Sequence, residues 1–129
     1  MLVSYSTCIL KGKGFSPKQA EDVMGIKFDV KNEVNEIGIV GKYKGRQVPF
    51  GSGTIKSLAD KDELCEKYVL NLVHEYIYEL KDIGVEEIIF SIAIEYEEQC
   101  NFELDRDFIT KLASLGVPLG ISCYRQTEG

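Results

Sequence analysis

The ten residues Glu87–Tyr96, "EIIFSIAIEY", carry the clearest secondary-structure signal in this 129-residue chain. Branched and aromatic side chains dominate the run, and large apolar residues recur at every second position, which is typical of a strand with one buried face. One face of this strand would carry Ile88, Phe90, Ile92, Ile94 and Tyr96. The other face would carry Ile89, Ser91, Ala93 and Glu95. The sequence therefore predicts a sheet whose core lies on the Phe90 side.

The segment that follows predicts a helix and a second strand. Apolar residues spaced as on a helix run from about Asp105 to Leu115, and Gly116 is a good stop. "VPLGISCY", residues 117–124, then predicts a strand with Val117, Leu119, Ile121 and Cys123 on its core side. Because strand–helix–strand crossovers are right-handed, we expect the two strands to be parallel.

The first half of the chain predicts shorter elements. A strand over residues 2–10 precedes a helix that is capped by Ser16, has Pro17 in its first turn and ends at Gly25. Residues 26–31, "IKFDVK", and 36–50, "EIGIVGKYKGRQVPF", predict further strands, with a hairpin turn at Gly45.

A long amphipathic helix is predicted from Asp60, with Glu63 three residues later, to Gly84. Its inner side would carry Val69, Leu72, Val73, Tyr76 and Leu80, and its polar side would carry the only histidine, His74. We expect the inner side to cover the sheet.

The predicted order of elements is β-α-β-β-(β)-α-β-α-β, in a single domain over residues 1–129. This order predicts an α+β fold with a mixed, mostly antiparallel sheet and helices mainly on one face, a sandwich related to the ferredoxin-like folds. No apolar run approaches the ~20 residues of a membrane-spanning helix, and the opening residues do not read as a signal peptide. The four cysteines, Cys8, Cys65, Cys100 and Cys123, show no paired spacing. Buried or incidental thiols in a reduced cytoplasmic setting are therefore expected.

Charge is distributed unevenly along the chain. Residues 1–59 carry nine Lys/Arg against five Asp/Glu, and residues 60–129 carry six against sixteen. Nucleic acid and anionic membranes are poor partners for a protein with a net charge of −6. The acidic half is either a solubilising face or a docking surface for a basic protein.

The residues that could carry chemistry do not form a catalytic pattern. "VPFGSGTIKS", residues 48–57, lacks the spacing of a phosphate-binding loop and precedes an acidic helix start, so we interpret "GSGT" as a mobile connection. His74 has no nucleophile and carboxylate beside it, and is expected to be a solvated residue. The acidic cluster between Glu95 and Asp107 lacks the glycine turn of a calcium loop. No catalytic, cofactor-binding or metal-binding residue is predicted, which favours a non-enzymatic protein.

One candidate interaction surface follows from the strand patterns. The sheet face opposite the core would present small residues with acidic and aromatic residues at its rim, and a solvated outer face is the alternative interpretation. The candidate residues are Ser4, Ser6, Ser91, Ala93, Glu95, Glu97, Glu98, Gly120, Ser122 and Tyr124. This surface would suit a protein partner, a small-molecule ligand or a second copy of the chain in a homodimer.

Three stretches give the chain a resemblance to a known family. "GFSPKQAEDVMGI" (14–26), "GSGTIKS" (51–57) and "FELDRDFITKLASLGVPLGISCY" (102–124) resemble segments of the bacterial domain-of-unknown-function family four-two-seven-nine. The family's middle segment usually carries a tryptophan, where this chain has Thr54 and Ile55. The resemblance implies no catalytic residues. Relatives look like proteins encoded beside polymorphic toxins, so it implies a protein-binding, immunity-type role.

Overall fold

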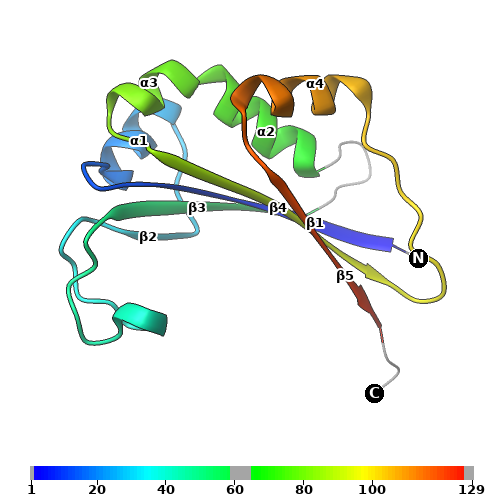
Figure 1. Cartoon of the computed structure of the whole chain (residues 1–129), viewed down its shortest axis with the longest axis horizontal. Helices are drawn as coiled ribbons and strands as arrows, with labels where there is room; N and C mark the ends of the chain where they lie inside the picture. The colour runs from blue at the N-terminus through cyan, green and yellow to red at the C-terminus, as the bar shows by residue number, and fades with distance from the viewer. Residues whose placement is uncertain (1, 59–64, 127–129) are drawn as a thin grey trace. The chain divides into compact units, whose positions relative to one another are not determined.

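The computed structural model describes residues 2–58 and 65–126 and contains a five-stranded mixed sheet with helices (Figure 1). The prediction of an α+β fold is confirmed. The strands lie in the order β2-β3-β1-β4-β5. The elements are β1 (Leu2–Gly12), α1 (Pro17–Met24), β2 (Val30–Asn32), a 3₁₀ turn η1 (Gly41–Tyr43), β3 (Gly51–Leu58), α2 (Cys65–Glu75), α3 (Ile77–Asp82), β4 (Glu87–Tyr96), α4 (Arg106–Leu115) and β5 (Leu119–Arg125).

The chain divides into two compact units. Unit 1 comprises Met1–Cys8, Lys56–Glu75 and Ile89–Gly129, and unit 2 comprises Ile9–Ile55 and Tyr76–Ile88. Strands β1, β3 and β4 contribute residues to both units. That residues 1–129 form one domain, and that the sandwich is related to the ferredoxin-like folds, stay predictions.

Unit 1 contains the strand–helix–strand segment that the sequence predicts. β4 pairs with β5 in parallel, with Phe90 opposite Leu119 and Tyr96 opposite Arg125. The Asp105 side chain accepts a hydrogen bond of 2.8 Å from the backbone N–H of Phe108 and caps α4, which ends at Gly116 in the left-handed conformation. The parallel pairing and both ends of the helix are therefore confirmed.

The core of unit 1 lies on the Phe90 face of β4. Phe90, Ile92 and Ile94 are buried, and the ring of Phe90 meets Phe108 of α4 edge-on, with 5.9 Å between the ring centroids. Helices α2 and α4 contact each other and lie on the same side of β4 and β5 (Figure 1). Lys111 Nζ donates to Asn71 Oδ1 over 2.8 Å, and Lys67 forms an ion pair with Asp105. These contacts hold the two helices over one face of the sheet.

Unit 2 is built around the capped helix α1. Ser16 Oγ accepts from the N–H of Gln19, and Gly25 ends the helix in the left-handed conformation, as predicted. The buried carboxylate of Glu21 accepts from Lys31 Nζ over 2.5 Å and from the N–H of Phe28 over 2.8 Å. Both hydrogen bonds lower the pKa of Glu21, with Lys31 the larger cause. This carboxylate therefore stays ionised while it ties α1 to the segment that enters β2.

The predicted strands between residues 26 and 50 are mostly wrong. Only Val30–Asn32 forms a strand, antiparallel to β3, and residues 36–47 form the turn η1 and two isolated bridges. Ile37 and Ile39 are exposed. The reason is local, because residues 38–49 contain three glycines and one proline, which favour turns over a continuous strand.

The interpretation of "GSGT" as a mobile connection is also wrong, because Gly51–Leu58 forms β3. A Cβ on Gly51 would lie 1.8 Å from the carbonyl oxygen of Phe15, and one on Gly53 would lie 2.6 Å from the ring of Phe28. Glycine is needed here because other parts of the chain approach the strand backbone closely.

The long helix is interrupted. Its predicted start at Asp60 and Glu63 lies outside the described residues, and the rest divides into α2 and α3 at Tyr76, whose φ of −107° and ψ of 16° are not helical. The buried side is rotated relative to the predicted one. Its buried residues are Val69, Leu70, Val73, Ile77 and Leu80, while Leu72 and Tyr76 are only half-buried.

Strand β5 departs from its predicted burial. Leu119 is half-buried, but Ile121, predicted in the core, is 44% exposed, and Cys123 is exposed. β5 is the last strand in the sheet order, so within the described residues it has a neighbouring strand, β4, on one side only. The prediction of a strand here is therefore confirmed, and the prediction that Ile121 and Cys123 are buried is wrong.

Replacing Phe90 with Ala should lower the free energy of unfolding by about 3–5 kcal/mol, because the ring is 2% exposed and its loss leaves a cavity beside Phe108. Chemical denaturation measures this change. Phe102→Ala is the matched control, since Phe102 is an exposed phenylalanine of the same unit and its truncation should cost far less. Equal losses in the two variants would contradict the assigned core.

Candidate functional site

The predicted small-residue surface is partly assembled on β4 and β5 of unit 1. In the register of the two strands, Ser91 lies opposite Gly120, Ala93 opposite Ser122, and Glu95 opposite Tyr124. Paired residues project to the same face of a sheet, and here it is the face opposite Phe90, Ile92 and Ile94. We call these six residues, together with Tyr5, the outer face.

Ser4 and Ser6 do not belong to the outer face, so their placement in the candidate surface is wrong. Ser6 is fully buried, as are Cys8 and Leu10 at alternate positions of β1. Tyr5, one residue away, instead reaches the outer face, where its hydroxyl donates to Glu95 Oε1. Alternation then puts Ser4 and Ser6 on the core side. Ser6 Oγ has no hydrogen-bond partner within the described part of the chain.

Glu95 is the centre of a small hydrogen-bond network on the outer face. Its Oε1 accepts from the Tyr5 hydroxyl, and its Oε2 accepts from Gln126 Nε2 over 3.1 Å. These two hydrogen bonds lower the pKa of Glu95, with Tyr5 the larger cause. The same bond, followed by burial and the charge of Glu95, raises the pKa of Tyr5. Glu95 therefore stays ionised at neutral pH and is poorly suited to act as a general acid.

The other acidic candidates differ in their surroundings. Glu97 and Glu98 are exposed and follow directly after the end of β4. Asp105 and Asp107, farther along, form ion pairs with Lys67 and Lys111. The hydrogen bond from Lys67 is the largest cause of a lowered pKa at Asp105. Glu97 and Glu98 thus place two exposed carboxylates beside the end of β4.

Tyr124 completes the outer face at the edge of the sheet. Its side chain is 58% exposed, although it belongs to a strand that is hydrogen-bonded to β4. An exposed aromatic ring with a hydroxyl group offers both apolar area and a hydrogen bond to a partner.

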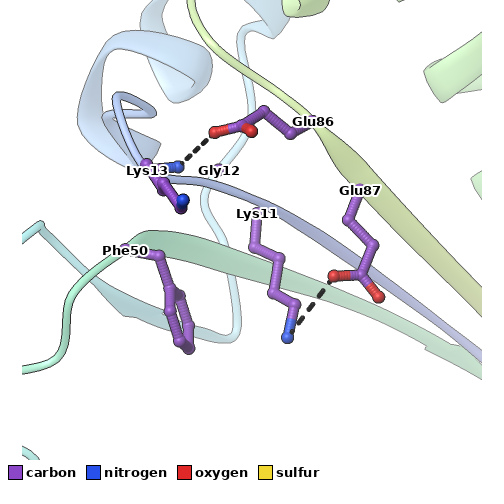
Figure 2. Close-up of a pocket in the computed structure, with 6 residues that line it drawn as sticks. All are labelled: Lys11, Gly12, Lys13, Phe50, Glu86 and Glu87. Atoms are coloured by element: carbon purple, nitrogen blue, oxygen red, sulfur yellow. Dashed lines mark hydrogen bonds and ion pairs between the residues drawn. The ribbon is translucent and has the colours of Figure 1, made fainter.

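Unit 2 holds a shallow pocket that the sequence did not indicate. Figure 2 shows its six lining residues, which enclose about 210 Å³: Lys11, Gly12, Lys13, Phe50, Glu86 and Glu87. Lys11 Nζ lies 3.6 Å from Glu87 Oε2 and 4.8 Å from the centroid of the Phe50 ring. The backbone N–H of Lys13 donates to Glu86 Oε1 over 2.6 Å.

The pocket lining carries two lysines and two glutamates and includes no histidine, cysteine, serine or tyrosine. Lys11 is paired with Glu87, and Glu86 accepts from the Lys13 backbone, so the pocket presents charged groups rather than a nucleophile with its base. Residues 11–13 and 86–87 are too far apart in the sequence for any spacing rule to have joined them.

Two of the four cysteines come together. Cys100 Sγ lies 3.4 Å from Cys123 Sγ in unit 1, although the spacing of the cysteines in the sequence indicates no pair. Cys8 fits the expectation of buried or incidental thiols, since it is fully buried and burial raises its pKa to about 12. His74 is half-buried on α2.

Within residues 2–58 and 65–126, no cluster of three or more His, Cys, Asp or Glu side chains could hold a metal ion. In the same part of the chain, no helix has both the length and the apolar character needed to cross a membrane. No known protein family, curated protein or solved structure matches the chain.

Replacing Tyr5 with Phe should raise the pKa of Glu95 toward its ordinary value, because the larger of its two stabilising hydrogen bonds is lost. A group with a lowered pKa stabilises the fold above its unfolded pKa, and that contribution is lost as the pH falls through the folded pKa. The variant should therefore lose stability at neutral pH and show a smaller further loss on acidification. NMR titration of the Glu95 carboxyl measures the pKa directly.

Tyr124→Phe is the matched control, since Tyr124 lies on the same face but its hydroxyl does not donate to Glu95. It should leave the Glu95 pKa nearly unchanged. An unaltered titration of Glu95 in the Tyr5 variant would show that the network does not hold this carboxylate.

Proposed function

We propose that this protein is a non-enzymatic protein-binding module, and that its binding element is the edge strand β5. One observation carries the proposal. β5 ends the sheet order, and every residue from Gly120 to Gln126 is exposed, including Ile121 at 44% and Tyr124 at 58%. A strand with exposed apolar side chains and an open edge is a ready site for a further strand from another chain.

The two edge strands of the sheet differ in how well they are protected against pairing with a further strand. Edge strands normally avoid unwanted pairing by being short or by carrying Lys, Pro or a bulge. β2, at one edge, has three residues and includes Lys31. β5, at the other edge, has seven residues, and its stretch Leu119–Tyr124 contains neither a charge nor a proline. This contrast supports β5 as a strand that is used for pairing.

The surrounding charge favours a basic partner. Glu97 and Glu98 are exposed directly after Tyr96, which is paired with Arg125 at the end of β5. Residues 60–129 as a whole carry six basic against sixteen acidic residues. We therefore propose that the partner contributes an extended segment rich in Lys or Arg, steered to this edge by its charge. The resemblance to family four-two-seven-nine stays a prediction; within the proposal, it would make this partner a toxin.

The alternatives have weaker support. A homodimer through β5 would bring the acidic residues of two copies together, which repulsion disfavours. A small-molecule site would need a concave surface, and the pocket described above is lined by residues of unit 2 rather than by the outer face. For an enzymatic role on the same face, Glu95 is held ionised and is therefore poorly suited to be the proton donor.

Ile121→Lys tests the proposal. The partner is first captured by the full chain from the source cell and identified by mass spectrometry, and the purified pair is then measured by calorimetry. A lysine on an open edge opposes strand addition and would also repel a basic segment, so the variant should bind at least about tenfold more weakly, which is ~1.4 kcal/mol. Its unfolding midpoint should fall far less than that of the core variant Phe90→Ala, because Ile121 is 44% exposed whereas Phe90 is 2% exposed.

Ile109→Lys is the matched control, because Ile109 is 51% exposed in the same unit but lies on helix α4. Equal weakening in both variants would contradict β5 as the binding element. The same measurement with Glu97 and Glu98 changed to Gln tests the charge of the partner. Slower association and a flatter dependence on ionic strength are expected, whereas an unchanged association rate would contradict a basic partner.

A further inference from the structure

Cys100 and Cys123 form a close pair of thiols at the surface of unit 1. Cys100 lies in the segment between β4 and α4, and Cys123 lies in β5. Their sulfur atoms are 3.4 Å apart, with the Cys100 thiol donating to Cys123 Sγ. Cys100 is half-buried and Cys123 is exposed, so solvent-borne reagents can reach the pair.

We propose that Cys100 and Cys123 constitute a reversible oxidation site that closes to an intramolecular disulfide. The two sulfur atoms must approach to about 2 Å to bond, which requires only a short movement from their present separation. The exposed Cys123 side chain is not fixed by packing in a core, so rotation about its own side-chain bonds can supply this movement.

Hydrogen peroxide is a suitable oxidant, and the reaction balances without any other reagent. The Cys123 thiolate attacks one peroxide oxygen and breaks the O–O bond, which gives a sulfenic acid at Cys123 and, with one proton, a water molecule. The Cys100 sulfur then attacks the Cys123 sulfur, the S–S bond forms, and the sulfenic oxygen leaves as a second water with the Cys100 proton. In total, the two thiols lose two electrons, and one hydrogen peroxide is reduced to two water molecules.

The surroundings of the pair fit this order of events. The hydrogen bond that Cys100 donates to Cys123 raises the pKa of Cys100, which disfavours Cys100 as the attacking thiolate. Cys123 is also the more exposed of the two thiols and meets the oxidant first. A small dithiol such as dithiothreitol would reverse the reaction through a mixed disulfide.

Cys8 provides an internal contrast. It is fully buried in β1, and burial raises its pKa to about 12, so it has neither the exposure nor the thiolate form that oxidation requires. Among the three cysteines whose side chains the structure describes, the oxidation site is therefore confined to Cys100 and Cys123. It does not depend on the proposed binding function, since it rests only on the geometry of Cys100 and Cys123.

The test treats the folded full-length chain with hydrogen peroxide, blocks the remaining thiols, and maps its peptides by mass spectrometry without reduction. We expect a cross-linked peptide pair containing Cys100 and Cys123, lighter by two hydrogen atoms and separated again by dithiothreitol. Cys8 should become alkylated only after unfolding. Because the bond restricts the unfolded chain, the oxidised protein should also have a higher denaturation midpoint than the reduced protein.

Cys100→Ser and Cys123→Ser are the control variants, and neither should gain stability on oxidation. Serine at these two surface positions should leave the reduced fold intact. The proposal is overturned if Cys100 stays a free thiol after peroxide treatment while Cys123 is converted only to a sulfinic or sulfonic acid or to a disulfide between two chains. It is equally overturned if the gain in stability persists in either variant.

Discussion

The rest of unit 1 depends on one constraint on strand β4. This strand buries one of its faces and at the same time pairs in parallel with β5. Phe90, Ile92 and Ile94 are buried on one side of this strand, where Phe90 meets Phe108 of α4. A slip of one residue would turn these side chains to solvent, so the register is strongly fixed. The outer face and the positions opposite it on β5 follow from that register.

The same constraint explains why β5 is unusual. A parallel neighbour of β4 must be reached by a crossover, and α4 supplies it. β5, reached in this way, lies at the end of the sheet order with Ile121 and Tyr124 exposed. The return of the chain also brings Cys123 to Cys100. Both proposals thus arise from one topological feature, although they rest on different observations.

Strong local signals were enough to predict part of this structure from the sequence. These signals each act within a few residues of the chain. They are the alternation in residues 87–96, the helix caps Ser16 and Asp105, and the helix stops Gly25 and Gly116. Where a signal has two physical meanings, the prediction was wrong. Gly51 and Gly53 could mark a turn or a close backbone approach, and the structure has the latter.

The candidate site could be predicted only in part, because its remaining features depend on distant residues. The segment "SYST" has polar side chains on both alternating sets, so nothing local showed that Tyr5 rather than Ser6 reaches the outer face. The exposure of Ile121 depends on the place of β5 in the sheet order. The Cys100–Cys123 pair and the contact of Lys11 with Glu87 join positions whose proximity exists only in the folded chain.

Amide hydrogen exchange of β5, measured with and without the captured partner, tests the central claim most directly. In the free protein, the amides of residues 119–125 that point away from β4 should exchange rapidly, because no strand covers them among the described residues. Strand addition should slow these amides selectively, while the short edge strand β2 keeps its rate. Protection that appears elsewhere in the complex, with the exchange of β5 unchanged, would contradict the account.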